Sequence, residues 1–236
     1  MTPASPAVPG HIGIIMDGNG RWAKARQQPR AQGHLEGLRR AKRIVKAASD
    51  LGVRYLTLYV FSTENWKRAA DEVGFIMALV RQYLKGELAF YRQNRIRIRH
   101  AGDIAGLPAD IGRILREAME ETRSFTGLQV VLALNYGGRD EIIRAARKMA
   151  ASGALDKETI TEEALSRHLD NPDIPDPDLI IRSAGEYRIS NFLLWEGAYA
   201  EYYVSRKLWP DWTEEDLSAA IAAFNARERR FGGISA

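Results

Sequence analysis

The chain has 236 residues, of which 45% are hydrophobic and 27% charged, and a formal net charge of +4, which is ordinary for a globular protein. It contains no cysteine, which excludes disulfides and thiolate metal sites and fits a reducing compartment. No apolar run approaches a membrane span, and the N-terminal MTPASPAVPG lacks a signal-peptide pattern, so we expect a cytoplasmic location with at most peripheral membrane contact.

Apolar runs alternate with helical patterns along the whole chain. Strands are predicted at residues 12–16, 55–61, 96–101, 130–134 and 179–181, and helices at residues 35–51, 72–90, 109–122, 140–151 and 162–169. A last helix is predicted to begin after Thr213, an N-cap with Asp216 three residues on, and to end at Gly232 and Gly233. The pattern indicates an α/β fold with a largely parallel central sheet flanked by helices. Residues 1–10 are expected to form a flexible arm and residues 11–236 a single domain.

Three polar clusters each follow a predicted strand. Asp17 follows the first strand, residues 62–66 follow the second, and Arg182 follows the last. Ligands of parallel sheets bind beyond the carboxyl ends of the strands, so we expect the three clusters to converge on one rim.

The first cluster lies in the stretch HIGIIMDGNGRW, where an apolar run ends at Asp17 and a glycine-rich turn. Asp-Gly and Asn-Gly favour hairpin turns, but the following WAKARQQPRAQGH shows no alternation typical of a second strand. The alternative is a strand-to-helix turn whose amides face an anion, although neither a Walker loop nor a GxGxxG fingerprint is present. Four cationic side chains follow the turn and suggest a diphosphate pocket: Arg21, Arg26, Arg30 and His34.

The other two clusters are each open to two interpretations. FSTENWKR places a hydroxyl, a carboxylate, an amide and an indole at a strand end, where they either cap the next helix or contact a substrate, and the two roles are compatible. In IIRSAGEYRISNFLLW, Arg182 and Arg188 flank a turn of small residues and Ser190 follows. This group suggests a second diphosphate clamp or, alternatively, a loop of salt bridges.

The acids and the basic excess indicate a metal-assisted reaction on anionic substrates. Glu201 is a lone acid in the apolar AYAEYY and needs a metal ion or an arginine as its partner. Together with Asp17 and the two arginine groups, it suggests a Mg²⁺-assisted reaction on two diphosphates, because Mg²⁺ takes few carboxylates and many phosphate oxygens. No zinc-finger or helix-turn-helix spacing supports a nucleic-acid partner.

Several multi-residue blocks occur in an order that resembles the cis-prenyltransferase family, in particular its bacterial undecaprenyl diphosphate synthases. The blocks are HIGIIMDGNGRWA, the GHxxG of residues 33–37, FSTENWKR, NYGGRDEI, RSAGEYRISNFLLWEGAYAEYY, LWPDW and RERRFGG, and they run from His11 to Gly233. The resemblance implies a homodimer and a hydrophobic tunnel for the growing lipid. One tunnel wall would be the apolar face of the helix predicted at residues 72–90, and Leu128 would lie near the floor.

The resemblance also implies roles for individual residues. The metal-binding and catalytic acid would be Asp17, the second metal-linked acid Glu201, and the proton acceptor Asn65. The implied substrate-binding residues are Gly18, Asn19, Gly20, Arg21, Trp22, Arg30 and His34 for the allylic diphosphate, Ser62, Thr63, Glu64, Trp66 and Arg68 for the substrate-contacting turn, and Arg182, Arg188, Ile189 and Ser190 for the isopentenyl diphosphate clamp. The family block RTGGE or RTSGE is RSAGE here, so Ala184 has less freedom than glycine, and Tyr187 replaces a histidine with a phenol, a poor Mg²⁺ ligand.

The activity implied is a repeated, Mg²⁺-dependent condensation of isopentenyl diphosphate onto an allylic diphosphate such as farnesyl diphosphate. The product would be a Z-polyprenyl diphosphate, with undecaprenyl diphosphate for the cell-wall lipid carrier as the expected one. Two alternatives are a phosphohydrolase that uses Asp17 as nucleophile and a non-catalytic partner of a prenyltransferase. A scaffold would not require the acid, amide and arginines that this chain retains together.

Overall fold

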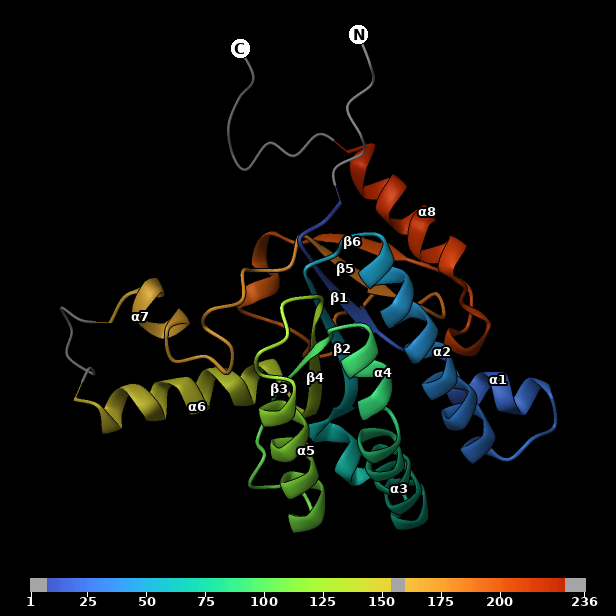
Figure 1. Ribbon diagram of the computed structural model, residues 1–236, viewed down its shortest axis with the longest axis horizontal. Coiled ribbons are helices and arrows are strands. Elements are labelled where there is room, and N and C mark those ends of the chain that lie inside the picture. Colours follow the sequence, from blue (N-terminus) through green and yellow to red (C-terminus); the bar gives the residue numbers. More distant parts are fainter. Residues whose placement is uncertain (1–7, 154–159, 228–236) are drawn as a thin grey trace, which may run out of the picture.

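The computed structural model of the protein describes residues 8–153 and 160–227 (Figure 1). The strands are β1 (His11–Ile15), β2 (Tyr55–Ser62), β3 (Arg97–Ala101), β4 (Gln129–Tyr136), β5 (Leu179–Arg182) and β6 (Glu201–Val204). The α-helices are α1 (Asn19–Ala25), α2 (Arg30–Asp50), α3 (Ala70–Gly86), α4 (Leu88–Gln93), α5 (Ala109–Glu121), α6 (Gly138–Ala151), α7 (Glu162–Ser166) and α8 (Glu214–Asn225). Three short 3₁₀ helices, η1 (Thr63–Lys67), η2 (Glu196–Tyr199) and η3 (Trp209–Asp211), lie between them.

The strands form one sheet in the order β3-β4-β2-β1-β5-β6, and every neighbouring pair is parallel. This confirms the predicted α/β fold as a single domain with a parallel central sheet. The register pairs Ile15, the last residue of β1, with both Tyr59 of β2 and Arg182 of β5. Because all strands run the same way, their carboxyl ends lie along one edge of the sheet.

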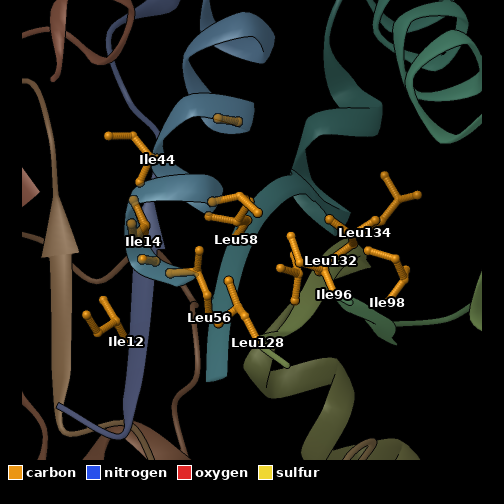
Figure 2. Packing of buried hydrophobic residues seen from close by; sticks show 14 of the residues in the cluster. Ile12, Ile14, Ile44, Leu56, Leu58, Ile96, Ile98, Leu128, Leu132 and Leu134 are labelled. Carbon is orange, nitrogen blue, oxygen red and sulfur yellow. The ribbon is translucent and has the colours of Figure 1, made fainter. Parts of the chain in front are cut away.

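Successive residues of each strand pack on opposite faces of the sheet, and two buried clusters result. Ile12 and Ile14 belong to the larger cluster, together with residues of α2, α3, α5 and α8, whereas Ile15 belongs to the smaller one. Figure 2 shows side chains of β1, β2 and α2 gathered in the larger cluster, with Ile44 next to Ile14. The smaller cluster is covered by Phe192 of the segment after β5. Both faces of the sheet are therefore buried, as the near-continuous apolar strands predict.

The structure differs from the predicted elements in three places. The helix predicted at residues 72–90 is two helices, α3 and α4, and the break at Glu87 allows Tyr91 to turn into the core, where it is 1% exposed. Neither α1 nor β6 was predicted. α1 has no apolar period and is stabilised by its contact with α2, whereas β6 is a four-residue edge strand whose pairing with β5 decides its conformation.

The ends of the predicted domain are only partly within the described residues. The start of α8 is confirmed, because the N–H and hydroxyl of Thr213 donate to the Asp216 carboxylate at 2.7 and 3.0 Å. Its predicted end at residues 232–233 is wrong, because α8 ends at Asn225 with Ala226 as its C-cap. Residues 1–7 of the predicted arm lie outside the described residues. Gly10, also assigned to that arm, donates its N–H to Asp178 at 2.7 Å. In the part of the chain that the structure describes, no helix has both the length and the apolarity of a membrane span.

Candidate active site

A polar pocket of about 1080 Å³ opens where β1, β2 and β5 end. The three clusters expected at one rim meet there. The predicted site residues that line it are Asp17, Gly18, Asn19, Gly20, Arg21, Arg30, His34, Ser62, Glu64, Asn65, Arg68, Arg182, Arg188 and Ser190.

The turn after β1 holds Asp17 at the floor of this pocket. Its backbone N–H lies 2.9 Å from Ser183 Oγ, and the Ser183 hydroxyl donates to the Asp17 carbonyl at 2.8 Å. Gly18 follows with φ 102°, and a Cβ there would lie 2.9 Å from the Leu208 side chain, so both conformation and space require glycine. Helix α1 begins directly afterwards. The turn is therefore strand-to-helix, and the hairpin alternative is wrong.

Helix α2 brings the second group of cations to the pocket because it packs unusually close to α1. Gly33 and Gly37 of the GHxxG block face Asn19, and a Cβ at either position would overlap its backbone or side-chain oxygen. Arg30 and His34 lie on the same stretch of α2 and line the pocket. The glycines thus set the distance at which these two side chains face the turn.

Arg182, the last residue of β5, connects two of the predicted clusters. It is only 6% exposed, and its Nη2 lies 2.8 Å from Asp17 Oδ2. Its Nη1 donates to Ser190 Oγ at 2.7 Å and to the Arg188 carbonyl. Arg188 itself points to solvent and pairs with Glu186 at 2.6 Å. The predicted loop of salt bridges is therefore present, with Arg182 buried and Arg188 exposed where it lines the pocket, and a diphosphate clamp at these residues stays a prediction.

The electrostatics keep Asp17 ionised and His34 neutral at pH 7. Burial by itself would raise the pKa of Asp17, but the hydrogen bond and charge of Arg182, the Gly18 N–H and the charge of Arg21 outweigh it, so this pKa lies below its usual value. Burial lowers the pKa of His34, although the nearby Glu72 carboxylate raises it in part. The pocket therefore presents a carboxylate surrounded by permanently charged guanidinium groups.

The turn at the end of β2 is itself a helix cap. The Asn65 side-chain oxygen accepts the Ser62 N–H at 3.1 Å, which closes a capping box on η1. Glu64 accepts a hydrogen bond from Asn191 at 2.7 Å. Ser62, Glu64 and Asn65 also line the pocket, so the capping role is confirmed and a substrate role for the same residues stays a prediction.

Several residues implied by the resemblance do not line the pocket. Trp22 donates its indole N–H to Asp211 at 2.7 Å, and Trp66 donates its own to Asn135 at 2.7 Å. Ile189 packs against the smaller buried cluster, and Thr63 lies on the far side of the turn, near Gly137. Of the arginines weighed in the sequence, Arg26 also turns away, pairing with Asp211 at 3.1 Å.

Glu201 lies away from Asp17. The expectation that these two acids hold one metal ion within a single chain is therefore corrected. Glu201 is the first residue of β6 and pairs in register with Leu179, whereas Arg182 at the other end of β5 contacts Asp17. Its partner is a guanidinium, that of Arg227. Parallel strands keep their starts and ends at opposite edges of the sheet, so spacing along the sequence did not reveal this separation.

Two residues that the sequence did not single out are Tyr59, which lines the pocket, and Glu72, which pairs with residues that line it. Glu72 Oε1 lies 2.9 Å from Arg68 Nη1, in an i,i+4 pairing that could have been read from the sequence. Tyr59 lines the pocket, stacks on Phe192 with ring centroids 4.6 Å apart, and donates its hydroxyl to the Ser190 carbonyl at 3.2 Å. The sequence around Tyr59 gives no sign of this role, because the register of the sheet decides which residues of β2 reach the pocket.

Two departures from the family block are also explained. Ala184 adopts φ 74°, the left-handed conformation that glycine takes without strain, and its N–H donates to the Lys207 carbonyl at 2.7 Å. Tyr187 is 84% exposed and does not line the pocket. No ligand role at position 187 is therefore assigned.

A narrow apolar cavity of about 100 Å³ adjoins the polar pocket. The two share residues at their junction, among them Met16, Tyr59 and Ile76. The cavity then runs between α2, α3 and the sheet, and its lining residues are Leu38, Ala41, Leu58, Leu79, Val80, Tyr83, Leu84, Leu132 and Leu134, with Trp209. Leu128 is buried in the same core but is not among the lining residues, so its expected place at a tunnel floor gains no support.

The donor set fits a hard divalent cation that takes most of its ligands from a substrate. The Asp17 carboxylate is 28% exposed toward the pocket, whereas Glu186 is engaged by Arg21 at 3.2 Å. Within the described residues there is no group of three or more histidine, aspartate or glutamate side chains placed to hold a metal. One carboxylate suits Mg²⁺, which completes an octahedron with phosphate oxygens and waters.

Comparisons with known proteins agree with this geometry. Residues 15–232 match a family model described as undecaprenyl diphosphate synthase. The chain is 54% identical to an isoprenyl transferase of Treponema denticola over 94% of this chain and 96% of the relative, and 49% identical to one of Rhizobium meliloti over 100% and 97%. Among solved structures, a lavandulyl diphosphate synthase from Lavandula x intermedia, in complex with dimethylallyl diphosphate, matches with a TM-score of 0.91, 36% identity and coverage of 95% and 98%. A probable undecaprenyl diphosphate synthase from Campylobacter jejuni matches with a TM-score of 0.81, 34% identity and coverage of 96% and 99%.

Proposed function

Since the chain belongs to the undecaprenyl diphosphate synthase family and is a prenyltransferase of isoprenoid biosynthesis, we propose that it condenses isopentenyl diphosphate repeatedly onto an allylic diphosphate. Farnesyl diphosphate is the proposed primer, and undecaprenyl diphosphate for the cell-wall lipid carrier is the proposed product. One observation carries this proposal: the cationic pocket around Asp17 opens directly into an apolar cavity. Such a site suits a molecule with a diphosphate head and a hydrocarbon tail.

We assign the two diphosphates to opposite sides of the pocket. The allylic diphosphate would bind between the turn after β1 and the side chains of Arg30, His34 and Arg68, of which the two arginines carry the positive charge. The isopentenyl diphosphate would bind Arg188 and Ser190 after β5, while Arg182 holds this loop to Asp17. Charge-assisted hydrogen bonds from guanidinium groups are the strong contacts that such ligands require.

The reaction follows from this placement. The allylic C–O bond breaks, and its electron pair leaves with the diphosphate, whose growing charge is stabilised by the arginines on that side. The isopentenyl double bond attacks the allylic carbon, and a proton is then lost. The Asn65 side-chain oxygen already accepts the Ser62 N–H and an amide is a weak base, so we assign Asn65 to positioning and the proton to a diphosphate oxygen.

Mg²⁺ is the proposed metal, and Asp17 is the residue that would hold it. When bound, the metal neutralises charge on the departing diphosphate. The low pKa of Asp17 keeps the carboxylate ionised and available. Glu201 has no part in this assignment, because its partner within the chain is Arg227.

The hydrocarbon would grow into the apolar cavity lined by α3. Each buried isoprene unit gains about 3–4 kcal/mol, taking about 0.8 kcal/mol per CH₂-sized group. Growth is therefore favourable until the chain meets a wall, and the cavity must widen as it does so. We propose that the reaction takes place in the cytoplasm and that the product is released at a membrane surface.

A homodimer is the proposed assembly. β6 is the edge strand of the sheet, and Tyr199 and Tyr202 beside it are 78% and 43% exposed. Exposed aromatic side chains next to an unpaired edge are typical of an interface. Light scattering of the purified chain at several concentrations tests this assignment, and a monomer at all of them would contradict it.

The test of the proposed activity is a coupling assay with purified protein, Mg²⁺, farnesyl diphosphate and labelled isopentenyl diphosphate, followed by extraction and sizing of the lipid. We expect a ladder of labelled polyprenyl products that disappears with EDTA and returns with Mg²⁺. Farnesyl diphosphate that loses phosphate without any coupling would instead support the phosphohydrolase alternative. The same assay with geranyl diphosphate identifies the preferred primer.

A further inference from the structure

Glu72 gathers three polar side chains that the proposed function assigns to the allylic diphosphate. Its Oε1 lies 2.9 Å from Arg68 Nη1, 3.2 Å from Arg30 Nε and 3.4 Å from His34 Nε2. Two of these donors come from α2 and one from the loop before α3, so a single oxygen joins two separate elements. The Glu72 side chain is 15% exposed, and its three partners Arg30, His34 and Arg68 all line the pocket.

The carboxylate occupies a position that suits a phosphate oxygen. Arg30 is 59% exposed and Arg68 is 34% exposed, and Glu72 is the ion-pair partner of both among the described residues. The exposed arginines thus converge because a negative charge draws them together, and a diphosphate brings a larger negative charge to the same donors.

Glu72 also connects this charge cluster to the apolar cavity. It lies in the first turn of α3, and Ile76 and Val80, one and two turns further on, line the cavity. The start of α3 has no side-chain cap, because Ala69 is at the N-cap position. Contacts of Glu72 with Arg30 and His34 are therefore a main polar attachment of this end of α3 to α2.

We propose that Glu72 is a positioning residue whose carboxylate competes with the diphosphate for the same partners: it holds Arg30, His34 and Arg68 together and is displaced when an allylic diphosphate binds. This inference rests on the proposed function, which assigns those three side chains to the allylic substrate. Displacement frees the first turn of α3 from α2. The polar head of the substrate then loosens the wall that its own hydrocarbon must pass.

Glu186, which pairs with two arginines that line the same pocket, provides the comparison. It pairs with Arg21 at 3.2 Å and with Arg188 at 2.6 Å, but it lies in the loop after β5 and is 32% exposed. It contacts no residue of α3 in these ion pairs. A diphosphate that displaces Glu186 would leave the cavity wall unchanged, so the coupling belongs to Glu72 alone.

The first experiment measures binding of inorganic pyrophosphate by calorimetry, with Glu72→Gln against the wild type. Glutamine keeps the shape and an amide oxygen that can still accept hydrogen bonds from the three side chains, and it removes the competing charge, so we expect binding to be about tenfold tighter, within the usual range of coupling between sites. The control is Glu36→Gln, which removes the carboxylate partner of the exposed Arg39 on the same helix as Arg30 and should leave the affinity unchanged. Equal or weaker binding by Glu72→Gln would overturn the proposal.

The second experiment follows hydrogen exchange of residues 70–76 in the wild type and in Glu72→Gln. We expect pyrophosphate to increase exchange in the wild type, and the variant to show the faster exchange already without ligand. Unchanged exchange in both proteins would overturn the proposed link to α3. Neither experiment needs turnover. If the wild type binds no pyrophosphate, the proposed diphosphate site itself is contradicted. If the wild type binds pyrophosphate and Glu72→Gln binds it equally well, only the inference about Glu72 is contradicted.

Steady-state kinetics separate positioning from catalysis. In Glu72→Gln we expect a lower KM for the allylic substrate with the KM for isopentenyl diphosphate unchanged. A fall in kcat with both KM values unchanged would mean that Glu72 acts on the reacting atoms, and would contradict its assignment as a positioning residue.

Discussion

Arg182 Nη2 lies 2.8 Å from Asp17 Oδ2, so an ion pair joins the last residue of β5 to the turn after β1. The guanidinium is buried, and it also holds Ser190 and the Arg188 carbonyl. One side chain therefore sets the position of the proposed metal acid and of the proposed isopentenyl diphosphate clamp. Substitutions of Asp17 and of residues in the loop after β5 should therefore affect different steps, metal binding in the first case and substrate binding in the second.

Asp17→Ala should abolish coupling while the protein remains folded. Arg182 keeps two hydrogen-bond acceptors in the variant, so the loss of one charge-assisted hydrogen bond should cost about 1.5–3 kcal/mol of stability. The measurements are product formation at saturating Mg²⁺ and a urea titration. Turnover near the wild-type rate would show that Asp17 does not hold the metal.

Arg188→Ala and Arg30→Ala should weaken different substrates. Arg188 lies after β5, and Arg30 lies on α2, so the first variant should raise the KM for isopentenyl diphosphate and the second that for the allylic substrate. Each lost contact is worth about 1.5–3 kcal/mol, or about ten- to a hundredfold in affinity. Arg188 is the better probe than Arg182, whose removal would also disturb Asp17. Equal effects of both variants on both substrates would argue against two separate clamps.

Product length should respond to residues that line the apolar cavity. A bulkier side chain at Leu79, such as tryptophan, should shorten the products, and Tyr83→Ala should lengthen them, because both positions line the cavity. Leu128→Ala is the matched control: it removes a buried side chain of the same core outside the lining, so it should cost about 2–5 kcal/mol of stability without altering the length. The measurement is the size distribution of the extracted lipids. If product length changes only in the Leu128 variant, the wall that stops chain growth is not formed by Leu79 and Tyr83.

His11 should make the protein less stable in mild acid. Its ring nitrogens lie 2.6 Å from the Pro175 carbonyl and 2.8 Å from the Thr57 hydroxyl, and burial lowers its pKa from 6.5 to about 4. Below pH 6.5 the unfolded chain takes up a proton that the folded one does not, so the stability present above pH 6.5 is lost as the pH falls toward 4. The full effect is about 3 kcal/mol.

The measurement for His11 is a set of urea titrations between pH 7 and pH 4.5, with His11→Gln as the comparison. The wild type should lose stability across this range more steeply than the variant. Parallel pH profiles of the two proteins would show that His11 titrates normally. Other buried acids change both proteins alike, so the difference isolates the imidazole.

Much of the site could be predicted from the sequence because strand ends are local features. An apolar run that stops at Asp17, or at Ser62, or at Arg182, marks the end of a buried strand in any parallel sheet. Once the alternation of elements indicated such a sheet, these three positions had to lie at one edge. The need for glycine at position 18 is also a local feature, since the left-handed φ of Gly18 belongs to the turn itself.

The tertiary structure alone decided which side chains at that edge reach the pocket. Trp22 and Trp66 stand within the right segments, but their indoles bond to Asp211 and Asn135 on other elements. Glu201 is separated from Asp17 because the register of β6 places its first residue opposite Leu179. Direction and register depend on packing between segments far apart in the chain, which no local pattern encodes.

The chain's sequence by itself thus determined the fold class, the edge that binds ligands and the chemistry of the turn after β1, because periodicity and turn residues act over a few neighbouring positions. Only the tertiary structure decided that Glu72, at the start of α3, meets Arg30 and His34 of α2. That meeting depends on the packing of α3 against α2, two helices that are separated in the chain by β2. These are long-range contacts, and their energies arise only when the whole sheet has brought the helices together.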